Sequence, residues 1–148
     1  MSGIYSEDMV VGDTREFGSH TVEEEEMIEF AKEYDPHPFH TGEETDKESI
    51  FDGLVASGLY MSSVTQRMLI EHLFRDSHVM GALGMDNLRW HHPVRAGDTL
   101  SVETEVVETN PINDDRDIVK IEITTSNQDD TEVMSFVFQT IFKRKDEL

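Results

Sequence analysis

The sequence predicts one α+β domain in which an antiparallel sheet wraps around a long, largely buried helix. The chain has 148 residues, and its 36% hydrophobic content suffices for one core of ordinary size. A broad apolar surface at helical spacing runs over residues 57–74, and segments of period-two alternation follow it. Because a helical region followed by strands argues against alternating βαβ units, we expect a single domain spanning residues 1–148.

A first helix is predicted over residues 22–34. Thr21 and Glu24 have the spacing of a capping box, and the apolar residues that follow recur at intervals of three and four. Two prolines then end the helix and predict a loop over residues 35–40. The second helix, residues 57–74, is the predicted central helix.

Three strands are predicted near residues 100–106, 119–123 and 134–142, separated by short turns rich in Asn, Asp and Gly. Residues 15–22 and 86–92 supply two further candidate strands. The last strand is apolar on both faces, so its second face needs a partner. We therefore expect a homodimer or a higher homo-oligomer.

The chain is strongly acidic and contains no cysteine. Its 32 Asp and Glu residues against 12 Lys and Arg give a formal net charge of -20, spread along the whole sequence. This charge repels a nucleic-acid backbone, and it predicts a halophilic protein whose self-repulsion is screened by concentrated salt. An ordinary acidic mesophilic protein is the alternative. The lack of cysteine excludes disulfides, thiolate-bound zinc and a cysteine nucleophile.

No apolar run approaches the roughly 20 residues that span a bilayer, and the first residues lack the character of a signal peptide. We therefore expect a cytoplasmic protein that does not enter a membrane. Residues 145–148 spell the KDEL retrieval signal of the endoplasmic reticulum, which we interpret as a coincidence.

Asp35 and His40 are the candidate catalytic pair, five residues apart across the two prolines. If the loop curls back, a carboxylate and an imidazole facing one gap could hold a water, take its proton and return a proton to the neighbouring carbon. In the alternative interpretation, Asp35 caps a turn and His40 is a partly buried loop residue.

Three ordered segments add to this interpretation. They are YDPHPFH (34–40), FDGLVASGL (51–59) and NLRWHHPVRAGDTL (87–100). Together they resemble the signature of MaoC-like dehydratases and (R)-specific enoyl-CoA hydratases, and the resemblance covers about residues 10 to 143. It implies a hot-dog fold and the reversible hydration of a trans-2-enoyl-CoA to a 3-hydroxyacyl-CoA, with the (R) product.

Residue by residue, the resemblance makes Asp35 and His40 the water-activating pair and Gly58 the oxyanion-hole donor through its backbone N–H. A glycine at the start of a helix suits that role, because free N–H groups and the positive end of the helix dipole favour negative charge. Close packing or a tight helix entry is the alternative reason for the glycine. His37 and Ser57 stand where the family usually has Asn and often has His, and both are candidate substrate-binding residues.

Arg89 and Arg95 are candidate contacts for the phosphates of coenzyme A, with ion pairing to nearby acids as the alternative. A metal site built from the loop histidines and the His91–His92 pair lacks a recognisable ligand motif, so we expect no metal. We expect one of His91 and His92 to face inward and one outward, and Trp90 and the methionines to be core residues.

No bound cofactor is expected, since coenzyme A arrives with the acyl-CoA substrate. Two other functions remain open. A thioesterase on the same fold would direct its water at the carbonyl carbon, although the Asp–His spacing favours hydration. An inactive acyl-CoA-binding or regulatory module is the other, supported only by the departures at His37 and Ser57.

Overall fold

The computed structural model describes residues 3–42 and 50–146, which form a five-stranded antiparallel sheet and several helices. The strand order is β1-β3-β4-β5-β2, so β1 and β2 are the two edges. The strands are β1 (Thr14–Thr21), β2 (Val79–Trp90), β3 (Thr99–Pro111), β4 (Arg116–Ser126) and β5 (Glu132–Lys143). The helices are a 3₁₀ turn (Ser6–Asp8), α1 (Glu24–Tyr34), α2 (Pro38–Thr41) and α3 (Gly58–Leu69), which continues as a π-helical turn (Ile70–Phe74).

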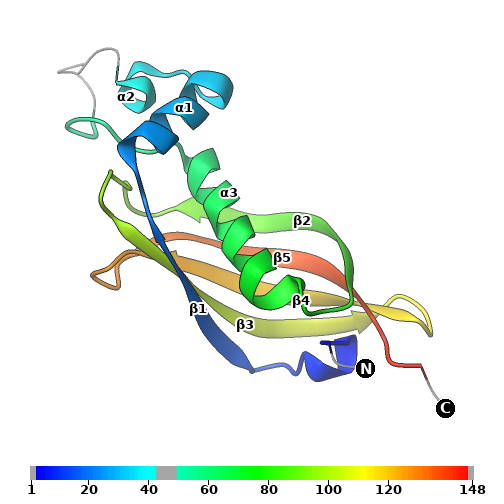
Figure 1. Ribbon diagram of the computed structural model, residues 1–148. Helices are drawn as coiled ribbons and strands as arrows, with labels where there is room; N and C mark the ends of the chain where they lie inside the picture. Colours follow the sequence, from blue (N-terminus) through cyan, green and yellow to red (C-terminus); the bar gives the residue numbers. More distant parts are fainter. Residues whose placement is uncertain (1–2, 43–49, 147–148) are drawn as a thin grey trace.

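Helix α3 crosses one face of the sheet, and α1 and α2 lie together at its N-terminal end (Figure 1). The predicted central helix is confirmed, and so are all five predicted strands. Strand β2 begins at Val79, well before the predicted start at residue 86. This earlier part of β2 escapes a period-two search because most of the strand is exposed on both faces.

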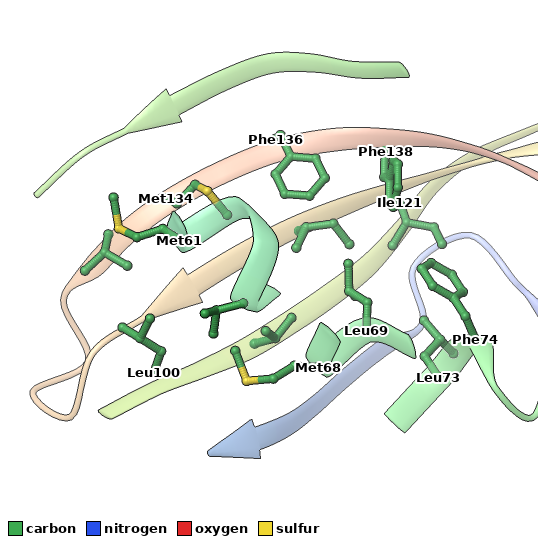
Figure 2. Close-up of a cluster of buried hydrophobic side chains, with 14 of the residues drawn as sticks. Met61, Met68, Leu69, Leu73, Phe74, Leu100, Ile121, Met134, Phe136 and Phe138 are labelled. Carbon is green, nitrogen blue, oxygen red and sulfur yellow. The ribbon is translucent and has the colours of Figure 1, made fainter. Parts of the chain in front are cut away.

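The core fills the space between α3 and the sheet. Figure 2 shows Met61, Met68 and Leu69 of the helix among side chains that β3, β4 and β5 supply. Leu69 and Ile121 are fully buried. Because burying a large apolar side chain contributes about 1.5–3 kcal/mol, this layer anchors α3 along most of its length.

Strand β1 reaches the helix through a bulge between Phe17 and His20. Gly18 lies in this bulge with φ +88°, and a Cβ there would stand 2.6 Å from the sulfur of Met68. Glycine is therefore required both by the backbone conformation and by the close approach of α3.

Two local predictions are wrong. Thr21 does not cap α1, because it is the last residue of β1 and its hydroxyl is 3.1 Å from that of Thr99. The helix instead starts at Glu24. The predicted loop over 35–40 also contains the start of a helical turn, since Pro38 occupies the first position of α2, where a proline needs no N–H acceptor.

None of the described helices combines the length and the apolar character that crossing a bilayer requires. The last two residues of the KDEL sequence, 147 and 148, lie outside the described residues.

Candidate active site

Asp35 and His40 come together at the N-terminal end of α3. Asp35 is the residue that ends α1, and its N–H donates to the carbonyl of Ala31. His40 lies in the single turn of α2 and is buried. The chain reverses between the two residues, and Nε2 of His40 lies 3.5 Å from Oδ2 of Asp35. The predicted pair is therefore assembled by the backbone that the two prolines shape.

The other ring nitrogen of His40 fixes the orientation of the imidazole. Nδ1 lies 2.8 Å from the carbonyl oxygen of Val55, which can only accept a hydrogen bond, so Nδ1 carries the proton. In the neutral ring, Nε2 is then an acceptor that points at Asp35. A lone pair and a carboxylate oxygen therefore face each other, an arrangement suited to a donor such as water placed between them.

Ser57 and His37 contact Asp35 from opposite sides. The buried hydroxyl of Ser57 donates to Oδ2 of Asp35 over 2.7 Å, while Nε2 of His37 lies 3.6 Å from Oδ1. The side chain of His37 is 64% exposed, and its ring stacks on Phe39. Ser57 thus contacts the carboxylate from the protein interior, and His37 lies on its solvent side.

Gly58 is the first residue of α3, and the ring of Trp90 packs directly against it. A Cβ at Gly58 would lie 2.3 Å from Cε2 of the indole, so no other residue fits there unless Trp90 moves. Close packing against Trp90, the alternative reason for this glycine, is therefore present in the structure. The Gly58 N–H has no acceptor within the described part of the chain, as expected at the first turn of a helix.

A cavity of about 510 Å³ lies over these residues. Asp35, His40 and Gly58 line it together with an apolar wall. That wall consists of Phe51, Val55, Ala56, Leu59, Met61, Trp90 and Pro93. His91 and His92 complete the lining. The cavity therefore combines one polar corner, where a reaction can occur, with a surface suited to an apolar chain.

Three predictions about nearby residues need correction. Trp90 is not a core residue, because it is 49% exposed and forms part of the cavity wall. Met80 and Met85 are also exposed, since β2 is an edge strand. His91 and His92 do not alternate between inside and outside, because β2 has ended at Trp90 and both histidines line the cavity.

The two arginines lie outside the cavity lining and have different surroundings. The guanidinium of Arg95 donates to the carbonyls of Phe51, Asp52 and Leu54 and so holds the segment before α3 in place. Arg89 is exposed, and its guanidinium donates to the carbonyl of Leu88. Within residues 3–42 and 50–146 neither arginine forms an ion pair.

No group of three or more potential metal ligands occurs among the described residues.

A separate polar cluster lies beside α3, where the buried Tyr60 hydroxyl donates to Glu26 and lies 3.3 Å from Nε2 of His20. Burial and the hydrogen bond to Glu26 raise the pKa of Tyr60. This tyrosine therefore keeps its proton at any ordinary pH and acts as a fixed donor.

Sequence reasoning missed two features of the site. The first is the position of Trp90 beside Gly58, which depends on how β2 pairs in the sheet. The second is the hydrogen bond from Ser57 to Asp35, which joins residues 22 positions apart. Neither feature has a local sequence signal.

The sequence matches the family described as "MaoC like domain" over residues 8–130. The MaoC-like dehydratase from Rhodospirillum rubrum superimposes with a TM-score of 0.88 at 35% identity, covering 98% of this chain and 100% of that chain. A monoamine oxidase regulatory protein from Archaeoglobus superimposes with a TM-score of 0.89 at 26% identity, covering 97% of each chain. The R-hydratase PhaJ1 from Pseudomonas aeruginosa has the same fold, with a TM-score of 0.74 at 24% identity, covering 99% of this chain and 90% of that chain.

The fold and the site together define a protein of the hot-dog class, with a central helix wrapped by an antiparallel sheet. Because the family match covers most of its length, this chain belongs to the MaoC-like dehydratase family. The resemblance seen in the three sequence segments is thereby confirmed.

Proposed function

We propose that this protein is a lyase that reversibly hydrates a trans-2-enoyl-CoA to a 3-hydroxyacyl-CoA. The observation that carries the proposal is the 3.5 Å approach of His40 Nε2 to Asp35 Oδ2 at the wall of the cavity. Both atoms are acceptors when the imidazole is neutral, so one water can donate a hydrogen to each.

The reaction balances with this pair alone. As the water oxygen bonds to C3 of the enoyl chain, the Asp35–His40 pair takes one of its protons, and electron density moves through C2 to the thioester oxygen. Return of that proton to C2 gives the hydroxyacyl product and restores the pair. No redox cofactor enters the balance, and coenzyme A is part of the substrate.

Gly58 is the proposed donor to the thioester oxygen. Its N–H lies at the start of α3, where the helix dipole favours the negative charge that develops during addition. The Trp90 ring against Gly58 forms one wall of the approach to this N–H. The (R) product rests on the family resemblance.

The substrate contacts are proposed from exposure and position. His37 lies on the solvent side of Asp35 and can contact the thioester region, whereas Ser57 contacts substrate only if its bond to Asp35 is rearranged. Arg89 is the more accessible of the two candidate phosphate contacts, because the Arg95 guanidinium is already bonded to three carbonyls.

A homodimer is part of the proposal. Edge strand β2 leaves four large apolar side chains exposed, an arrangement that suits pairing with a second copy of the chain. They are Met80, Leu83, Met85 and Trp90. Light scattering at micromolar concentration should give twice the monomer mass of 17.0 kDa, and a particle of that monomer mass contradicts the dimer.

The test of the activity is a panel of enoyl-CoA thioesters of different chain length and branching. Loss of the conjugated double bond is followed by absorbance, and free thiol is followed in the same samples. We expect the double bond to disappear without thiol release. Thiol release would identify a thioesterase, and tight binding without turnover would identify an acyl-CoA-binding module. Either result overturns the proposal.

A further inference from the structure

The extended segment that enters α3, residues 55–57, is held on both sides by backbone hydrogen bonds. The N–H of Val55 donates to the carbonyl of Phe39 over 3.0 Å, and the N–H of Ala56 donates to the carbonyl of Val94 over 2.8 Å. The segment therefore has a fixed position between α2 and the connection from β2 to β3. A rigid segment of this kind can orient the groups that contact it.

Both members of the catalytic pair bond to this segment. The carbonyl of Val55 accepts from His40, and the hydroxyl of Ser57 donates to Asp35. The Ser57 hydroxyl also accepts the N–H of Leu59 over 3.2 Å, which caps α3. The Ser57 oxygen thus accepts the Leu59 N–H with one lone pair, and its single proton is donated to the carboxylate of Asp35.

We infer that Ser57 is a positioning residue, which holds the Asp35 carboxylate at the distance from His40 that a shared water requires. This inference rests on the proposed hydration. The bond from Ser57 reaches Oδ2, the same oxygen that faces His40, whereas Oδ1 faces the exposed His37. Ser57 also directly precedes Gly58. One hydroxyl therefore joins the water-activating carboxylate to the helix end that carries the proposed oxyanion donor.

Without this bond the carboxylate is free to rotate toward the solvent side. Asp35 directly follows the last residue of α1, its side chain is 22% exposed, and the side chain of His37 beside it is 64% exposed. A shift of about 1 Å in a reacting group can lower a rate about 100-fold. Loss of the Ser57 hydroxyl should thus act on turnover much more than on substrate binding.

The test uses Ser57→Gly, because glycine is a good helix N-cap and removes the hydroxyl with little loss of helix stability. Ser63→Ala is the matched control, since it removes another hydroxyl of α3, one that is exposed and donates to the carbonyl of Leu59. We expect Ser57→Gly to lower kcat by about 10- to 100-fold with KM changed less than about threefold. Ser63→Ala should leave both constants unchanged.

A double-mutant cycle then decides whether Ser57 acts through Asp35. In the Asp35→Asn background, Ser57→Gly should cost less than about twofold in kcat, because the carboxylate it positions is already gone. An equal loss in both backgrounds overturns the inference, as does a Ser57→Gly protein with wild-type kcat.

A crystal structure of Ser57→Gly separates this inference from the proposed function. We expect the Asp35 carboxylate to rotate away from His40, and a carboxylate that stays in place overturns the inference whatever the activity. A wild-type protein that fails to hydrate any enoyl-CoA overturns the proposed function, while the crystal structure still decides whether Ser57 positions Asp35.

Discussion

The two ends of α3 differ sharply in what surrounds them. At the N-terminal end, polar groups converge: Ser57 caps the helix and bonds Asp35, and His40 faces the same carboxylate. At the C-terminal end, the π-helical turn places Leu73 and Phe74 in the apolar core, where they are almost fully buried. Figure 2 shows this end packed beside Phe138 and Ile121.

The difference has a physical basis. Free N–H groups and the positive end of the dipole occur only at the start of a helix, so a site that stabilises negative charge belongs there. The other end has no such use, and its apolar packing holds the helix on the sheet. We expect substitutions at the first end to change turnover and substitutions at the second end to change stability.

The largest effect is expected at the catalytic pair. Asp35→Asn and His40→Ala should each lower kcat for hydration by about two to four orders of magnitude, the range of general acid–base groups. Because both residues handle one water in the proposed reaction, the double variant should be little worse than either single variant. Steady-state kinetics measure the loss, and Tm should change little. An Asp35→Asn protein that keeps most of the activity would show that the site is elsewhere.

At the other end of the helix, Leu73→Ala should lower the free energy of unfolding by about 2–5 kcal/mol, because it leaves a cavity in a fully packed core. Thermal melts give the change, and kcat per folded molecule should stay near wild type. Val10→Ala, at an exposed position, is the control and should change stability by less than about 0.5 kcal/mol. If Leu73→Ala lowered kcat strongly and left Tm unchanged, the expectation that the C-terminal end of α3 governs stability and not turnover would be wrong.

Salt should raise the stability of the whole protein, because acidic residues are spread along the entire sequence. With a net charge of -20, the folded state is strained by repulsion that multimolar potassium chloride screens. Tm should rise between low and multimolar salt by about 5–10 °C, which corresponds to about 2–3 kcal/mol at this size. A Tm that stays constant or falls contradicts the halophilic interpretation.

The smallest effect is expected on the sheet, away from both ends of α3. Glu16 and Glu103 lie directly opposite each other on β1 and β3, and their hydrogen bond raises the pKa of Glu103. A raised pKa in the folded state means that the pair stabilises the fold at low pH and that this stabilisation is lost as pH rises through that pKa.

Glu103→Gln should therefore raise the free energy of unfolding at pH 7 and low salt by about 0.5 kcal/mol, since like charges opposite each other destabilise a sheet. The gain should shrink in multimolar salt and at acidic pH, where melts of both proteins are compared. A gain that is independent of both pH and salt would mean that charge repulsion is not its cause.

The sequence by itself determined the elements and the identity of the chemical groups. The periods of its apolar residues predicted α1, α3 and the strands, because a buried face must repeat with the geometry of the element that carries it. The spacing of Asp35 and His40 made them a candidate pair, and the resemblance of the three sequence segments to a known family added Gly58 to the candidate site.

Only the tertiary structure decided how these groups are held. The carbonyl of Val55 bonds Nδ1 of His40, the hydroxyl of Ser57 donates to the carboxylate of Asp35, and Trp90 packs on Gly58. Thr21 likewise lost its predicted role as a helix cap because it pairs with Thr99, which is 78 residues away in the sequence but lies on the neighbouring strand β3. Each of these contacts joins segments that are separated in the sequence and meet only in the folded chain. Local propensity and spacing carry no information about such neighbours, so the orienting contacts of the site could not be read from the sequence.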